Sequence, residues 1–302
     1  MLLTFCDFYD FEKTVNKPHF YARKKEEQGV ATVYCFKGKC KDKKCAEICE
    51  NDKIKLFKKI ASNKKYRSEY GLFPLEGVRL VEDAAMENAE MSFVIASETA
   101  SEKFPELLEK LEEKCGKIIT VPDDLASSLA QTQGTQGIFA ACKMPKSISA
   151  DELVKERGKY AVLVQLQDPG NMGTIIRTAD AMGVDGIIAV NCCDIYNPKT
   201  VRSTMGSLFR MKIANADEDE MFAALKSKGI ETFASVIDSD ALSLTECSFK
   251  NGAAVLIGNE GNGLSRETVS RCDKKLTIHM NGNVNSLNAA TAASIIMWEL
   301  TK

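Results

Sequence analysis

The stretch from Tyr160 to Gly183 constrains the fold most strongly, because it joins an apolar run to an amphipathic segment through a tight polar turn. Residues 160–166 (YAVLVQL) are almost wholly apolar, which is typical of a buried parallel strand. The turn formers at 168–171 end that strand. The pattern predicts a strand, a loop and a helix, with Arg177 off the buried face. Apolar residues recur at helical spacing up to Gly183, at Met172, Ile175, Ile176, Ala179 and Met182.

The same alternation extends through the C-terminal half of the chain. The pattern predicts strands at 160–166, 186–191, 208–214, 230–236, 253–258 and 274–279. Helices fit between them at 172–182, 198–205, 217–228 and 265–271, and an alanine-rich helix closes the chain at 288–300. Strands that alternate with helices favour an α/β fold with a parallel, helix-covered sheet.

A smaller α/β module precedes this sheet. It begins with a basic amphipathic helix near Ile54, and helices and strands alternate up to a final strand at 137–142. With 302 residues, 44% of them hydrophobic, the chain is long enough for two domains. We therefore divide it into an N-terminal extension at 1–50, a module at 51–145 and a parallel-sheet domain at 146–302.

Charge is distributed unevenly along the chain. Between Lys37 and Arg67, eleven lysines and one arginine face four acidic residues, a net charge of +8. The total is −2, so the remainder carries −10. A basic segment on an acidic body indicates a polyanionic partner, although a solvated helix face has the same composition. The candidate contacts are Lys58, Lys59, Lys64, Lys65 and Arg67.

The eleven cysteines do not indicate a disulfide framework. Several lie in apolar segments, as reduced thiols of a cytoplasmic protein do. Four lie in the extension with C-x4-C-x4-C-x3-C spacing, whereas zinc knuckles have two-residue gaps within each pair. We therefore favour a disordered or loosely helical extension with free thiols over a metal site, and expect no bound metal. These four are Cys35, Cys40, Cys45 and Cys49.

The sequence has no membrane signature. No apolar run approaches the roughly 20 residues that a membrane-spanning helix needs. The N-terminus lacks the basic start and continuous apolar core of a signal peptide. We expect a cytoplasmic protein that does not bind membranes.

Three loops of the C-terminal half place glycine beside polar residues directly after predicted strands. They cover 168–173, 258–263 and 280–288, and they contain Asn171, Glu260, Ser286 and Asn288. Because ligands bind α/β sheets at the carboxyl ends of the strands, we expect one composite site. Asn171, Glu260, Asn288 and Arg177 also have simpler interpretations. The two asparagines can be helix N-caps, Arg177 can pair with Asp180, and Glu260 can be a solvated turn residue.

Other kinds of active site find no support. The chain has neither the phosphate-binding G-x-x-x-x-G-K-[ST] nor a G-x-G-x-x-G that opens a helix. His279 is the only histidine of the C-terminal half, and no G-x-S-x-G elbow accompanies it. What remains is a set of amides, a glutamate, a serine and an arginine, which is suited to orienting reactants.

Three ordered motifs resemble those of the SpoU (TrmH) family of RNA ribose 2'-O-methyltransferases. They are N-x-G-x-x-x-R from Asn171 to Arg177, G-N-E-G-x-G-L at 258–264 and I-x-M-x-G-x-V-x-S-L-N at 278–288. Residues 201–211 also resemble the family. His279 stands where the family usually has proline, and Asn285 stands where it often has glutamate or another polar residue. The resemblance covers roughly 54–302, and the module resembles the family's ribosomal-protein-like substrate-binding domain.

This resemblance implies a deep trefoil knot in the C-terminal domain, S-adenosylmethionine as methyl donor and a homodimer through that domain. Structured RNA would be the substrate, with 23S ribosomal RNA expected and transfer RNA as the alternative. Two rival interpretations are a non-catalytic RNA-binding protein that kept the knot and an unrelated α/β enzyme for a small anion. Carried over by position, the catalytic residues would be Asn171, Arg177, Glu260, Ser286 and Asn288, and the cofactor contacts Gly258, Ile278, Met280 and Leu287.

Overall fold

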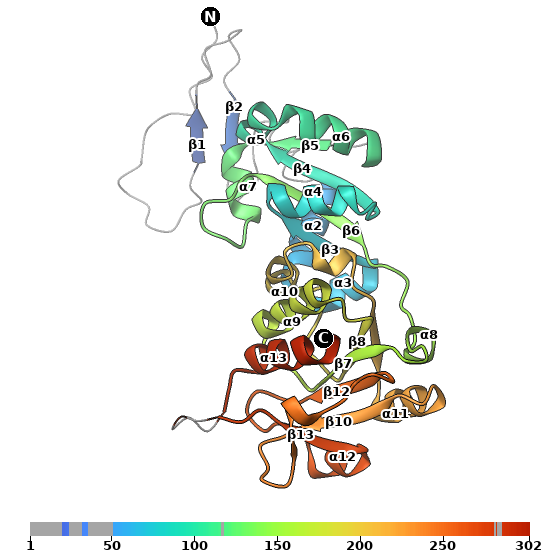
Figure 1. Cartoon of the computed structure of the whole chain (residues 1–302). Helices are drawn as coiled ribbons and strands as arrows, with labels where there is room; N and C mark the ends of the chain where they lie inside the picture. Colours follow the sequence, from blue (N-terminus) through green and yellow to red (C-terminus); the bar gives the residue numbers. More distant parts are fainter. Residues whose placement is uncertain (1–19, 24–31, 36–50, 116–117, 281, 283–285) are drawn as a thin grey trace, which may run out of the picture.

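The computed structural model describes residues 20–23, 32–35, 51–115, 118–280, 282 and 286–302, with side chains from residue 51 onward. Two sheets with their helices lie one above the other, and α3 and α10 lie at the junction between them (Figure 1). We call the upper part the module and the lower part the catalytic domain. Among the described residues, no helix is long and apolar enough to cross a membrane.

The module contains a four-stranded mixed sheet in the order β3-β6-β4-β5. β6 is antiparallel to both of its neighbours, and β5 is parallel to β4. The strands are β3 (Leu72–Glu76), β4 (Met91–Ser97), β5 (Ile118–Val121) and β6 (Ile138–Lys143). The helices are α2 (Asp52–Ser62), α3 (Lys64–Tyr70), α4 (Val78–Met86), α5 (Glu98–Lys103), α6 (Pro105–Cys115) and α7 (Asp123–Leu129).

The catalytic domain contains a seven-stranded sheet in the order β11-β13-β10-β12-β7-β8-β9, and all of its pairings are parallel. The strands are β7 (Lys159–Val164), β8 (Gly186–Val190), β9 (Ile213–Ala216), β10 (Glu231–Ser235), β11 (Leu242–Ser243), β12 (Ala253–Ile257) and β13 (Lys274–Thr277). The helices are α8 (Ala150–Leu153), α9 (Pro169–Met182), α10 (Pro198–Ser203), α11 (Glu218–Ser227), α12 (Arg266–Arg271) and α13 (Ala289–Thr301).

The central strands are buried on both faces, which explains their continuous apolar runs. In β7, Ala161 and Leu163 face a core that contains the buried residues of α9 and α13. Tyr160 and Val162 face a second core, shared with α8 and α11. The helices thus cover both faces of the sheet and leave the carboxyl ends of the strands for the polar loops.

The predicted α/β architecture is confirmed, and several boundaries differ. The strand expected at 208–214 is wrong, because Met205 and Gly206 make a turn at φ of 48° and 87° and a 3-10 helix, η1 (Ser207–Phe209), follows. β9 therefore begins only at Ile213. α9 begins at Pro169 instead of Met172. The short elements α5, α8, β11 and η2 (Leu244–Glu246) were not predicted, and the trefoil knot stays a prediction.

Within the N-terminal extension, β1 (Phe20–Arg23) and β2 (Thr32–Cys35) form an antiparallel pair. This pairing differs from the disordered or loosely helical extension that we expected. Cys40, Cys45 and Cys49 lie outside the described residues, as does the side chain of Cys35. The prediction about their thiols is therefore not tested by the structure.

Candidate active site

The first loop of the site connects β7 to α9. Gln165 adopts a left-handed conformation, with φ of 55°, which ends the strand. Asp168 is the N-cap of α9, and its Oδ1 accepts a hydrogen bond from the backbone N–H of Asn171 at 2.9 Å. Pro169 occupies the first helical turn, where its missing N–H costs nothing. The N-cap is thus Asp168, and the interpretation of Asn171 as an N-cap is wrong.

Glu260 joins the second loop to the first. Its carboxylate accepts hydrogen bonds from the backbone N–H groups of Gln167 at 3.1 Å and Asp168 at 2.9 Å. It also accepts one from Nδ2 of Asn171 at 3.2 Å. Partial burial raises the pKa of Glu260, but these three donors and its own backbone N–H together outweigh it and lower the pKa below the ordinary value of 4.5. Glu260 is therefore an ionised anchor for the first loop at neutral pH.

Asn288 joins the third loop to the first. Its Nδ2 donates a hydrogen bond to Oδ1 of Asn171 at 3.0 Å. Its own Oδ1 accepts from the N–H groups of Ala290 at 2.9 Å and Thr291 at 3.3 Å, which caps α13. Asn288 thus has both interpretations at once, as a helix cap and as part of the composite site. Asn171 is the residue that contacts both other loops.

The turn that carries Glu260 is held by its own hydrogen bonds. The backbone groups of Asn259 and Gly263 exchange two bonds, at 3.1 and 2.9 Å. The side chain of Asn259 donates to the carbonyl oxygen of Gln165 at 2.9 Å. A Cβ on Gly258 would lie 2.3 Å from the backbone carbon of Gly263, so only glycine fits this turn. The turn is therefore rigid and tied to the end of β7.

Arg177 and Ser286 are exposed and are not part of this hydrogen-bonded cluster. The ion pair that we considered between Arg177 and Asp180 is not formed, because Asp180 accepts from Nε and Nη2 of Arg210 at 3.0 and 2.8 Å. No ion pair of Arg177 occurs among the residues with described side chains. Its guanidinium is thus available to an anionic ligand.

The predicted cofactor contacts lie beside the same loops. Gly258 is buried after β12, and Ile278, Met280 and Leu287 are half-buried around the third loop. The rigid glycine turn follows β12, and the partly exposed apolar side chains follow β13. They offer the backbone polar groups and apolar walls that an adenosine and its methionine chain need. The residues present therefore suit S-adenosylmethionine.

Lys199 is a neighbour of the site that sequence analysis missed. It lies on α10, is exposed, and its Nζ is 3.2 Å from Oδ2 of Asp168. The bond from the N–H of Asn171 and the proximity of Lys199 lower the pKa of Asp168. No sequence signal identifies Lys199, because the contact depends on how α10 packs against α9.

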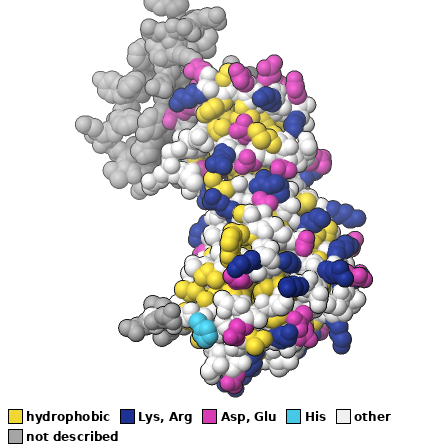
Figure 2. Space-filling view, viewed as in Figure 1, with side chains coloured by type: hydrophobic (Ala, Val, Ile, Leu, Met, Phe, Trp, Pro, Cys, Tyr) yellow, Lys and Arg dark blue, Asp and Glu magenta, His cyan; other side chains and the backbone are white. Residues whose placement is uncertain are grey.

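The basic surface of the module is formed by Lys58, Lys59, Lys64 and Lys65, which are all exposed on α2 and α3. We call these four residues the lysine surface. Basic side chains gather at the waist between the two parts of the molecule (Figure 2). Arg67 is a correction to our prediction, because it is only 3% exposed and its guanidinium is bonded to Asp194. An arginine that is buried in this way cannot contact RNA phosphates.

Two family models match the chain. One, described as the SpoU rRNA Methylase family, matches residues 158–298, and one described as an MRM3-like substrate binding domain matches residues 51–140. The 23S rRNA (guanosine(2553)-2'-O)-methyltransferase RlmP of Bacillus subtilis is 30% identical over 255 residues, which are 84% of this chain and 98% of that protein. The chain belongs to the SpoU rRNA methylase family.

Solved structures of the SpoU family agree with the fold. An AdoMet-bound rRNA methyltransferase from Sinorhizobium meliloti superposes with a TM-score of 0.75 at 28% identity, over 83% of this chain and 94% of that chain. The SpoU methyltransferase AviRb of Streptomyces viridochromogenes, in complex with AdoMet, has a TM-score of 0.75 at 26% identity and covers 83% and 97%. Both likenesses span the module and the catalytic domain together.

Proposed function

We propose that this protein transfers a methyl group from S-adenosylmethionine to a ribose 2'-hydroxyl of 23S ribosomal RNA. The observation that carries the proposal is the joining of three loops through Asn171, which bonds Glu260 at 3.2 Å and Asn288 at 3.0 Å. The names of the relatives support the substrate, because both RlmP and a 29% identical Streptomyces viridochromogenes protein are 23S rRNA 2'-O-methyltransferases.

The reaction needs orientation more than covalent catalysis. S-adenosylmethionine supplies an activated methyl group, and Gly258, Ile278, Met280 and Leu287 would hold it. Glu260 and Asn288 fix Asn171 from two sides, so the polar face is preorganised before RNA binds. Ser286 lies two residues before Asn288 and is exposed, so its hydroxyl is available to the ribose.

We assign Arg177 the role of a cation that stabilises the 2'-oxygen as its proton leaves. The alternative, in which Arg177 removes the proton, requires a neutral guanidinium, which is strongly disfavoured at neutral pH. Arg177 is exposed, and no acidic side chain pairs with it among the residues whose side chains are described, so its charge is available to the substrate. A cation placed where negative charge develops lowers the barrier without itself reacting.

The module supplies RNA affinity in this proposal. The lysine surface is exposed on two adjacent helices, as a contact to phosphates requires. A ribose 2'-hydroxyl carries no base identity, so the selection of the nucleotide must come from RNA shape and from contacts outside the reacting group.

We further propose that the protein is a cytoplasmic homodimer that forms through α13. Trp298 and Ile295 on this helix are 57% and 38% exposed. Hydrophobic side chains gather over α9 and α13 on the same face (Figure 2). A large exposed tryptophan on a helix that packs against α9, as α13 does, is typical of an interface anchor.

The test is methylation of 23S rRNA transcribed in vitro, with labelled S-adenosylmethionine, followed by mapping of every 2'-O-methyl position. We expect methylation at one ribose, and its loss in Asn171→Ala. Methylation of transfer RNA alone would support the alternative substrate. RNA binding without methyl transfer to either RNA would support a non-catalytic protein and contradict the proposal.

A further inference from the structure

A buried ion pair crosses the junction between the module and the catalytic domain. Arg67 of α3 donates from Nε and Nη2 to Oδ2 of Asp194, at 2.9 and 2.5 Å. The two side chains are 4% and 13% exposed. The residues are 127 positions apart in the chain, and Asp194 lies between β8 and α10. The pair therefore joins the two parts of the molecule directly.

The third nitrogen of the Arg67 guanidinium is also bonded. Its Nη1 donates to the carbonyl oxygen of Ile60 in α2 at 2.6 Å. A buried guanidinium is tolerated only when its charge is paired and its N–H groups are bonded. Because these bonds fork in a plane, they hold α2, α3 and Asp194 in one relative orientation. The two helices held in this way carry the lysine surface.

Asp194 is in turn held close to the loop between β7 and α9, which we call the catalytic loop. Its Oδ1 accepts from the N–H of Tyr196 at 3.0 Å. The N–H of the preceding residue, Cys193, donates to the carbonyl oxygen of Leu166 at 2.8 Å. Leu166 directly precedes Gln167, whose N–H binds Glu260. The ion pair thus anchors the module one hydrogen bond away from the loop between β7 and α9, which leads to Asn171 in the first turn of α9.

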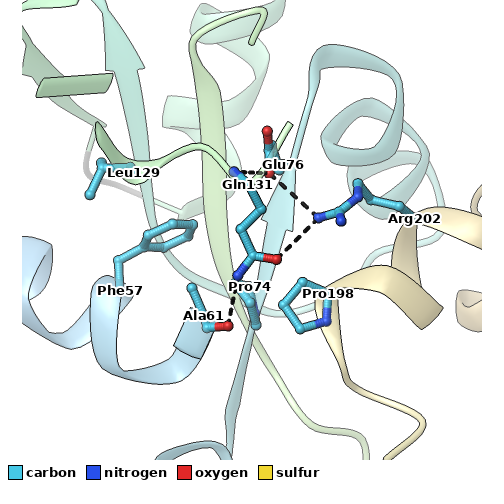
Figure 3. Close-up of a pocket in the computed structure, with 8 residues that line it drawn as sticks. All are labelled: Phe57, Ala61, Pro74, Glu76, Leu129, Gln131, Pro198 and Arg202. Carbon is cyan, nitrogen blue, oxygen red and sulfur yellow. Dashed lines mark hydrogen bonds and ion pairs between the residues drawn. The ribbon is translucent and has the colours of Figure 1, made fainter. Parts of the chain in front are cut away.

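A second set of contacts lines the same junction (Figure 3). Arg202 of α10 lies 3.5 Å from the carboxylate of Glu76 and 3.4 Å from Oε1 of Gln131, both in the module. On another part of the junction, the ring centroids of Phe73 and Tyr196 are 4.9 Å apart. Buried apolar residues of both parts form one continuous core. The module is therefore packed onto the catalytic domain.

We propose that the Arg67–Asp194 pair sets the position of the module and thereby selects the nucleotide that is methylated. This inference rests on the proposed function. RNA held by the lysine surface reaches the catalytic loop at a distance and angle that the docked module determines. Arg67 and Asp194 are positioning residues, because they act through the placement of other groups. A loosened module would present neighbouring nucleotides to the same catalytic loop.

The test compares three variants on 23S rRNA transcribed in vitro, with every 2'-O-methyl position mapped. Asp194→Ala removes the buried partner. Glu87→Lys places a second cation beside Arg210, an exposed contact across the junction at 3.4 Å. Asp238→Lys is the matched control, because it reverses an acid that is 33% exposed, against 36% for Glu87, and that pairs with Lys275 within the catalytic domain.

We expect both junction variants to bind S-adenosylmethionine and RNA within about twofold of wild type. Methylation at the wild-type nucleotide should fall about 10- to 100-fold, because small displacements of reacting groups have effects of this size. New methyl groups should appear on neighbouring nucleotides, and the control should match wild type. A merely structural role would not produce such new positions.

An unchanged rate and position in both junction variants would overturn the proposal, as would a lower rate without any new position. If Asp194→Ala does not fold, Asp194→Asn, which keeps the size of the side chain but removes the charge that pairs with Arg67, decides by the same criteria. If wild-type protein leaves 23S rRNA unmethylated, the proposed function fails, and nucleotide selection fails with it. Small-angle scattering then still tests whether contacts across the junction hold the module in place. If they do, the distance distribution should be broader in Glu87→Lys than in Asp238→Lys.

Discussion

At the scale of single residues, the site is held together by a few side chains that each make several hydrogen bonds. Asn171 contacts Glu260 and Asn288, and Glu260 accepts from two backbone amides besides. These residues were predicted from their loops, because polar side chains after parallel strands converge at one edge of a sheet. Their pairing was not predictable, because it depends on side-chain directions that only the packed loops determine.

Glu260→Gln tests the anchor. A glutamine side chain has one acceptor oxygen and two N–H donors, so it would face at least one of its three present donors with another donor. Hydrogen bonds to charged groups contribute about 1.5–3 kcal/mol, so we expect the single-turnover rate to fall about 10- to 100-fold. The exposed Glu246→Gln is the control and should keep the wild-type rate.

The same variant has a pH signature in stability. Because the folded pKa of Glu260 lies below its unfolded value, its contribution to stability is present above the unfolded pKa and is lost as pH falls through the folded pKa. Wild type should therefore melt above Glu260→Gln at pH 7, and the difference between the two melting temperatures should shrink as pH falls below the ordinary glutamate pKa of about 4.3. A constant difference across this range would show that the charge is not involved.

Substitutions of Arg177 distinguish electrostatic stabilisation of the 2'-oxygen from base catalysis. If its charge does the work, Arg177→Ala should lose about 10²-fold or more in rate, Arg177→Lys should keep part of it, and both should bind S-adenosylmethionine normally. The deciding measurement is the pH profile of the single-turnover rate. A log-linear rise from about pH 6 to 9 in wild type that vanishes in Arg177→Lys would identify Arg177 as the base and contradict our assignment.

At the scale of helices and strands, the length of an element decided whether it could be predicted from the sequence. β7, β8 and β12 were recognisable as strands, because both of their faces are buried and their runs are continuously apolar. α5 and α8 span six and four residues, which is too short for a helical period to show. β9 was misplaced, because the apolar residues of η1 resemble a strand when only composition is read.

Gly258→Ala tests the turn after β12. The added Cβ would lie 2.3 to 2.5 Å from backbone atoms of Gly263 and Leu264, which cannot rotate away. Overpacking of this kind costs about 1–3 kcal/mol, so we expect a lower melting temperature and weaker S-adenosylmethionine binding by calorimetry. Gly261→Ala in the same turn is the control, because its Cβ would meet nothing nearer than 3.5 Å. Equal effects of the two variants would exclude steric crowding as the cause.

The lysine surface is a property of α2 and α3 together. Reversal of all four lysines to glutamate should weaken RNA binding and flatten its salt dependence, since each lost phosphate contact lowers the slope by roughly 0.7–0.9. S-adenosylmethionine binding should not change. The control reverses four exposed lysines of the catalytic domain, Lys155, Lys212, Lys226 and Lys250. RNA affinity that falls equally in both variants would refute a localised RNA surface.

At the scale of the whole molecule, counting charges along the sequence led to a wrong prediction for a buried residue. Arg67 belongs to the basic segment and was predicted to contact RNA, yet it pairs with an aspartate far along the chain. A local count of charges cannot detect such a partner. Conversely, the two-part α/β organisation was predictable, because it follows from alternation repeated over most of the chain.

The homodimer is the remaining prediction at this scale. An interface through α13 would bury Trp298, and a lysine there would place an unpaired charge inside it, which is strongly unfavourable. We therefore expect wild type to have the mass of a dimer in light scattering and Trp298→Lys to have that of a monomer. Met86→Lys is the matched control, because Met86 is 67% exposed in the module, where we expect no interface. If Trp298→Lys stays dimeric while Met86→Lys dissociates, the subunits meet through the module. The exposed tryptophan would then need another explanation.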